Sequence, residues 1–215
     1  MNANARVFAH AARKTWKELS GRRFTTRHRL SETLAVDVFV RELTRLEPSW
    51  AKSLWMEARP FGLETKERID IWIDWRAARS PLAVEVKVGD PAFPHANGRS
   101  ATRGGMISDV AKLASALRHT PLGYAYVLYF GRADYFKGED LFSGLAAKAA
   151  AQQTIVTLSK LPANQQEREW SYIADWLQPQ HETPTKVGLR LLARQVLPRK
   201  ERDGFGFWFW QVQLP

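Results

Sequence analysis

Two β-rich runs that follow each other closely in the sequence constrain the fold of this chain most strongly. The first spans 67–75, ERIDIWIDW, and the second spans 82–88, LAVEVKV. Because successive side chains of a strand point to opposite faces, the even-numbered positions of the second run form one apolar face, and Glu85 and Lys87 lie on the other. Asp70 occupies an even position of the first run, so pairing of the two strands can bring it beside Glu85. We therefore predict two neighbouring strands with a buried face and a charged face.

The apolar periodicity of the remaining sequence predicts further helices and strands. We predict helices at 1–20, 31–46, 108–119, 139–152 and 163–177, and strands at 53–60, 122–131, 153–158, 186–197 and 205–214. Residues 89–106 are rich in Gly and Pro and are predicted to form a long loop, a kind of segment that is often functional. Three strands, a helix and another strand in this order indicate an α/β domain with a mixed central sheet flanked by helices.

The chain divides by composition into three predicted units. Residues 1–30 form a basic N-terminal helical arm, 31–160 form the α/β core, and 161–215 form a C-terminal extension of a helix and an aromatic β-hairpin. In this hairpin Trp208 and Trp210 alternate with phenylalanines. We interpret the run as core or dimer-interface packing in preference to a base-stacking surface, because both faces of the strand are apolar.

The positive charge is concentrated at the two ends of the chain. There are 32 Lys and Arg against 22 Asp and Glu, a net charge of +10. Residues 1–30 contain eight basic residues and one acid, whereas 31–179 contain 18 residues of each sign. A polyanion is the natural partner of such a chain, nucleic acid first, although a solvated basic surface is the alternative. The candidate phosphate contacts are the arginines of the basic connector and of the predicted loop: Arg22, Arg23, Arg27, Arg29, Arg99 and Arg103.

The absence of cysteine excludes several classes of protein. A disulfide scaffold, a cysteine-ligated zinc or iron–sulfur site and a cysteine nucleophile are all ruled out. No apolar run approaches the ~20 residues of a membrane span, and the N-terminus lacks the continuous apolar stretch of a secretion signal. We therefore expect a cytoplasmic protein without a membrane partner.

The charged face of the two strands carries residues that suit metal-dependent chemistry. Asp70 and Glu85, two carboxylates on neighbouring strands, make an oxygen site of the kind that Mg²⁺ or Mn²⁺ prefers. Lys87 could hold or deprotonate a water molecule, or neutralise charge that develops on a phosphate. Asp74 lies on the same strand face and competes with Asp70 for the ligand role. The alternative is a solvated face on which Asp70 and Lys87 form a surface salt bridge worth about 0–1 kcal/mol.

The spacing of these residues resembles the motif of the PD-(D/E)xK nuclease superfamily. Asp70 is followed by fourteen residues and then by Glu85, Val86 and Lys87. The predicted elements over 31–131 follow the order of that family's core, a helix, a three-strand meander, a helix and a further strand. The resemblance implies a restriction-endonuclease-like fold in which Asp70, Glu85 and the carbonyl of Val86 bind the metal, and it implies that Lys87 is the catalytic lysine.

Two helices of the predicted core carry further carboxylates. The family often places an accessory glutamate on its first helix, and Glu32 matches this glutamate in position, with Asp37 and Glu42 as rivals on the same helix. The resemblance thus implies a catalytic role for Glu32. On the helix after the motif, Asp109 follows the cap-like Ser108, so we interpret it as a residue that the positive end of the helix dipole favours.

The function that the resemblance implies is hydrolysis of nucleic acid by a Mg²⁺- or Mn²⁺-dependent phosphodiesterase. An endonuclease is expected rather than an exonuclease, and DNA rather than RNA, from the habits of the family. Two other classes stay open. One is an inactive nuclease-fold module that binds nucleic acid or a protein partner. The other is an assembly protein whose aromatic C-terminal strand builds a homodimer or a larger oligomer.

Overall fold

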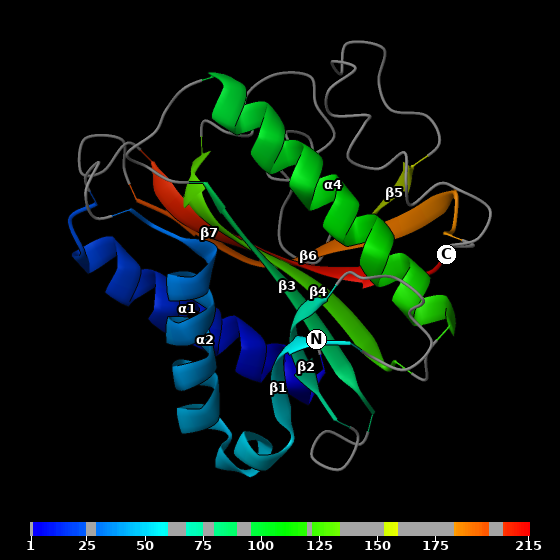
Figure 1. Cartoon of the computed structure of the whole chain (residues 1–215), viewed down its shortest axis with the longest axis horizontal. Coiled ribbons are helices and arrows are strands. Elements are labelled where there is room, and N and C mark those ends of the chain that lie inside the picture. Colours follow the sequence, from blue (N-terminus) through cyan, green and yellow to red (C-terminus); the bar gives the residue numbers. More distant parts are fainter. Residues whose placement is uncertain are drawn as a thin grey trace.

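Helices flank a seven-stranded sheet in the computed structural model of the chain (Figure 1). It describes residues 2–24, 29–59, 68–74, 80–89, 96–119, 122–133, 153–158, 183–197 and 204–215. The helices are α1 (Ala3–Gly21), α2 (Glu32–Leu46), the short 3₁₀ helix η1 (Pro48–Lys52) and α4 (Ala96–His119). The strands are β1 (Leu54–Ala58), β2 (Ile69–Ile73), β3 (Leu82–Gly89), β4 (Tyr124–Arg132), β5 (Gln153–Thr157), β6 (Lys186–Val196) and β7 (Phe205–Gln213).

The strands pair in the order β1-β2-β3-β4-β7-β6-β5. β3 and β4 are parallel, and the other neighbouring pairs are antiparallel. A parallel pair needs a long crossover connection, and α4 runs within that connection across one face of the sheet (Figure 1). The prediction of an α/β fold with a mixed sheet flanked by helices is therefore confirmed.

The sheet separates two hydrophobic clusters, one on each face. On one face, Val110 of α4 belongs to a buried cluster with Val127 of β4 and Trp210 of β7. On the other face, Phe8 of α1 belongs to a cluster that includes Val84 of β3. Because the central strands are covered on both faces, β4 and β7 are almost continuously apolar instead of alternating.

Side-chain caps fix where the first two helices begin. Asn2 Oδ1 accepts a hydrogen bond of 2.7 Å from the Ala5 N–H, and Ser31 Oγ accepts one of 3.1 Å from the Leu34 N–H. The second bond satisfies an otherwise unpaired donor at the start of α2. It makes Glu32 the first residue of α2.

Helix α4 begins earlier than the sequence predicts. Residues 96–106, which we assigned to a loop, are helical, so that prediction is wrong over this stretch. The prolines of the segment all precede Ala96, and packing of α4 against the sheet offsets the low helix propensity of its glycines. Arg99 and Arg103 therefore lie on α4 and not in a loop. The helices predicted at 139–152 and 163–177 lie outside the described residues.

Both strands of the aromatic C-terminal hairpin lie inside the sheet, with β7 next to the central strand β4. β7 pairs with β6 on one side and with β4 on the other. Trp208 and Trp210 are buried in the cluster under α4, so the interpretation of this run as core packing is confirmed within one chain. Phe8 of α1 stacks against Phe209 of β7 on the opposite face. The described strands of the predicted core and extension thus form one sheet, and α1 of the predicted arm packs against it. None of the described helices is long and apolar enough to cross a membrane.

Candidate functional site between the sheet and helix α4

Asp70 and Glu85 lie at the end of the ladder that joins β2 and β3. The last paired residues of this ladder are Ile71 and Val84, so Asp70 and Glu85 occupy the next position along the two strands. Asp70 Oδ2 accepts a hydrogen bond of 2.7 Å from the backbone N–H of Val86. This bond holds the Asp70 carboxylate against the strand that carries Glu85.

Glu85 is buried, and Asp70 is half-buried. Glu85 is 1% exposed, and its Oε1 lies 2.8 Å from Lys112 Nζ. Burial raises the pKa of Glu85 well above its usual value, Asp109 raises it further, and Lys112 opposes both effects. Burial also raises the pKa of Asp70, and the hydrogen bond from Val86 offsets part of that rise. A cation placed at these carboxylates would favour their ionised forms.

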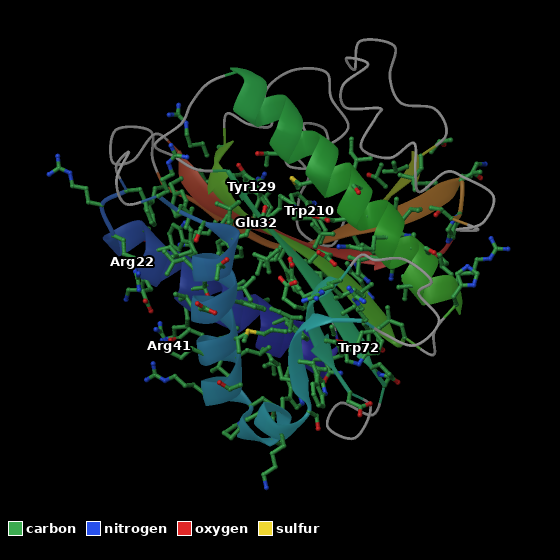
Figure 2. The ribbon with its side chains drawn as sticks, in the orientation of Figure 1. Arg22, Glu32, Arg41, Trp72, Tyr129 and Trp210 are labelled. Atoms are coloured by element: carbon green, nitrogen blue, oxygen red, sulfur yellow. The ribbon has the colours of Figure 1, made fainter. Side chains whose placement is uncertain are left out.

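Two further carboxylates hold the ammonium group of Lys87. Lys87 Nζ lies 3.2 Å from Glu32 Oε1 and 3.3 Å from Asp109 Oδ2. Glu32 reaches the lysine from the first turn of α2, and Figure 2 shows it at the end of that helix. Burial alone would lower the pKa of Lys87, but the charges of Asp109 and Glu32 outweigh it and raise the pKa above its usual value. Lys87 therefore stays protonated at neutral pH, which suits charge neutralisation better than removal of a proton from water.

Helix α4 contributes two charged residues that the sequence analysis did not assign to the site. Asp109 lies between the two lysines, with Oδ2 facing Lys87 and Oδ1 3.7 Å from Lys112 Nζ. Its interpretation as a helix N-terminal residue is wrong, because α4 begins at Ala96 and Asp109 lies in its interior. Asp109 and Lys112 are buried, at 6% and 5% exposure. The signal that could have revealed them is a pair of opposite charges three residues apart within an apolar helical stripe.

A glycine of α4 makes space for the side chain of Lys87. Gly105 lies one turn before Asp109 on the helix. A Cβ atom at this position would lie 3.3 Å from Lys87 Cε and 3.6 Å from Lys87 Nζ. The missing side chain at Gly105 thus allows Lys87 to lie between α4 and the start of α2.

Among the residues that the structure describes, the site has more carboxylates than cationic groups. Its charged members are Glu32, Asp70, Glu85, Asp109, Lys87 and Lys112. When all six are ionised, two negative charges are in excess, which one divalent cation would balance. Among the described residues, no group of three or more His, Asp or Glu side chains is arranged to hold a metal ion. A metal here would therefore need other oxygen ligands besides Asp70 and Glu85, such as a backbone carbonyl, water or phosphate.

The rival carboxylates lie elsewhere. Asp74 follows the end of β2, and its backbone N–H donates a hydrogen bond of 2.9 Å to Ser53 O. Glu42 forms ion pairs with Arg41 and Arg45 along α2. Asp37 is exposed. Of the three carboxylates considered on α2, Glu32 is the one that contacts Lys87.

The predicted phosphate contacts at the α1–α2 connection lie on the surface. Arg22, labelled in Figure 2, is exposed and forms an ion pair of 2.6 Å with Glu18. Arg23 and Arg29 are also exposed, and Arg27 lies outside the described residues. The connection leads directly into the start of α2, where Glu32 contacts the site.

No family model, curated protein or solved structure matches this chain.

Proposed function

We propose that the protein is a metal-dependent nuclease with a restriction-endonuclease-like core of the PD-(D/E)xK type. Support for this fold comes from the order α2, β1, β2, β3, α4, β4, in which an antiparallel three-strand meander lies between two helices and a parallel strand follows. This is the order that the family resemblance implies for residues 31–131.

The observation that carries the proposal is the placement of three charged groups on one sheet face. Asp70 and Glu85 lie opposite each other in register on the adjacent strands β2 and β3. Lys87 follows on the same face as Glu85, and its ammonium lies 3.2 Å from Glu32, the accessory carboxylate of the motif. Glu32 and Lys87 lie 55 positions apart in the sequence and form an ion pair, which supports the role that the resemblance implies for Glu32.

The proposed mechanism divides the work among these residues. Asp70, Glu85 and the carbonyl of Val86 would hold Mg²⁺ or Mn²⁺, which supplies an activated water molecule and polarises the phosphate when it is bound. Lys87, kept protonated by Asp109 and Glu32, stabilises the negative charge that develops on the phosphate during attack. Glu32 orients Lys87 through their ion pair.

The nucleic acid is the polyanion that the +10 charge of the chain favours, with DNA preferred over RNA by the family resemblance. The exposed Arg22, Arg23 and Arg29 are the described candidates for phosphate contacts. They are joined in the proposal by Arg27, Arg99 and Arg103.

The test uses supercoiled plasmid, linear single-stranded DNA and RNA, each with Mg²⁺, Mn²⁺, Ca²⁺ or EDTA. We expect Mg²⁺ or Mn²⁺ to support cleavage, Ca²⁺ to support binding without turnover, and EDTA to stop the reaction. Conversion of the closed circular plasmid identifies an endonuclease, because an exonuclease needs a free end. Absence of cleavage and of divalent-ion binding with all three substrates would reject the proposal.

A second function, binding without cleavage, is favoured by one contact in the site. Lys112 Nζ lies 2.8 Å from Glu85 Oε1. Glu85, a proposed metal ligand, therefore already has a cationic partner in the absence of metal. If the module is inactive, the protein binds nucleic acid equally well in EDTA and in Mg²⁺ and cleaves none of the substrates. The same set of reactions therefore separates the two functions.

A further inference from the structure

Lys112 is a buried lysine whose ammonium group has three partners among the described residues. Its Nζ lies 2.8 Å from Glu85 Oε1 and 3.7 Å from Asp109 Oδ1, and it donates a hydrogen bond of 2.9 Å to the backbone carbonyl of Arg68. Lysine is seldom buried unless its charge is compensated. Lys112 is 5% exposed, so these partners replace the water that would otherwise solvate its charge.

The contact with Glu85 places a positive charge where a metal ligand is proposed. An ammonium and a divalent cation compete for a carboxylate, because each draws on the same oxygen lone pairs. We propose that Lys112 is an internal substitute for the metal ion: it neutralises Glu85 in the metal-free protein and must leave Glu85 when a divalent cation binds. This inference rests on the proposed function, since it concerns the same carboxylates.

The surroundings of Lys112 provide a second position for its ammonium group. Asp109 Oδ1 is already within 3.7 Å of Nζ, so a second carboxylate is close enough to receive the ammonium when it leaves Glu85. Asp109 faces Lys87 through Oδ2, so its Oδ1 is the oxygen that can receive the displaced lysine. Lys87 does not occupy this place, because its ammonium is bound by Glu32 and by the other oxygen of Asp109.

Two properties follow from such a substitute. The metal-free protein keeps a folded site, because the lysine offsets the repulsion among Asp70, Glu85 and Asp109. Divalent ions bind more weakly than they would to the same carboxylates without the lysine, because they must break the Lys112–Glu85 ion pair. Lys112 is thus a positioning residue that sets the affinity of the site for metal.

The test measures Mn²⁺ affinity by isothermal titration calorimetry in the absence of nucleic acid, comparing the wild-type protein with Lys112→Met. Methionine keeps an unbranched side chain of similar length and removes the charge. We expect the dissociation constant for Mn²⁺ to fall by about tenfold or more, because the competing ammonium is gone. Lys17→Met, which removes an exposed lysine of α1, is the matched control and should change the constant less than about twofold. Unchanged or weaker Mn²⁺ binding by a folded Lys112→Met protein would overturn the inference.

A crystal of the wild-type protein grown with Mn²⁺ tests the inference without any substitution. This test remains valid even if Lys112→Met fails to fold. We expect anomalous density beside Asp70 and Glu85, with Lys112 Nζ turned from Glu85 toward Asp109. Density in that place with Lys112 still in contact with Glu85 Oε1 would overturn the inference and leave the proposed function standing. Absence of Mn²⁺ from the crystal and from the titrations of every variant would overturn both.

Discussion

The two ion pairs of Lys87 give its substitution a specific signature. Lys87→Met removes the charge proposed to stabilise the reacting phosphate, so we expect single-turnover cleavage to fall by about 100-fold or more. Binding of nucleic acid in Ca²⁺ should change little, because the interaction strengthens mainly in the transition state. Because the side chain is only 18% exposed and pairs with Glu32 and Asp109, its loss should also lower the free energy of unfolding by about 1–3 kcal/mol. The control is Lys17→Met, measured at a temperature where both variants are folded. Cleavage at the wild-type rate by Lys87→Met would show that Lys87 has no role in the mechanism.

Asp70 can be neutralised without losing its hydrogen bond. In Asp70→Asn the amide oxygen can still accept from the Val86 N–H, while one of the four carboxylates of the site loses its charge. We expect the melting temperature of the metal-free protein to stay the same or rise, because burial and Asp109 both disfavour the charge of Asp70. Mn²⁺ binding should weaken and cleavage should be lost. Asp74→Asn is the control, and loss of metal binding with Asp74→Asn alone would move the ligand to the end of β2.

The sequence predicts the strand residues of the site but not those of α4. Alternation along a strand is sufficient to put Glu85 and Lys87 on one face, and the β2–β3 ladder then sets Asp70 beside Glu85. The roles of Asp109 and Lys112 depend on how α4 crosses the sheet. This crossing is a tertiary property that the helical periodicity alone does not contain.

At the scale of elements, the distance between α4 and β3 is tested by Gly105→Ala. Alanine favours a helix over glycine by up to ~1 kcal/mol, but here its Cβ would lie 3.3 Å from Lys87 Cε, and that side chain is held by two ion pairs. We therefore expect cleavage to decrease while the melting temperature is maintained. Gly21→Ala at the end of α1, where a Cβ would meet nothing within 4 Å, is the matched control and should leave cleavage unchanged. Equal cleavage by the two variants would show that Lys87 tolerates the displacement.

The strands were easier to predict than the start of α4. β2, β3, β4, β6 and β7 are marked by β-branched and aromatic residues between turn-like segments, and each lies within one residue or two of its predicted range. In 96–106 the glycines lower the local helix propensity and so favour a loop. Packing of α4 against β3 and β4 stabilises the helix in spite of this low propensity. Such packing becomes visible only when the sheet that α4 covers is known.

At the scale of the whole molecule, the basic charge predicts a salt-dependent affinity for nucleic acid. We expect replacement of Arg22, Arg23, Arg27 and Arg29 by Gln to weaken binding about equally for different sequences. It should also flatten the dependence of log K on log salt concentration by about one unit for each phosphate that is no longer neutralised. The matched control replaces Arg13, Lys14, Arg41 and Arg45, four exposed basic residues of α1 and α2. If log K depends on log salt concentration with the same slope in the connection variant and in the control variant, the α1–α2 connection makes no specific contact with the phosphates.

The order of the sheet is the part of the fold that the sequence alone does not reveal. Patterns that recur over a few residues identify β4, β6 and β7 as strands, but the place of β7 between β4 and β6 joins segments distant in sequence. The hydrophobic pattern predicts that β7 is buried on both faces, but it does not predict which elements cover those faces. Phe8 and Phe209 share a cluster because of this pairing, not because of any local signal.

The packing of α1 on β7 has a consequence for how the protein is made. Trp16 donates to the carbonyl of Phe205 and its ring contacts Phe207, so α1 finds its partners on β7, a strand that is synthesised much later than the helix. At ~5–20 residues per second, the 189 residues that follow Trp16 up to and including Phe205 take roughly 10–40 s to translate. During that interval the apolar face of α1 has no β7 to cover it. This apolar face of α1 therefore stays without its native cover on β7 until β7 has been synthesised.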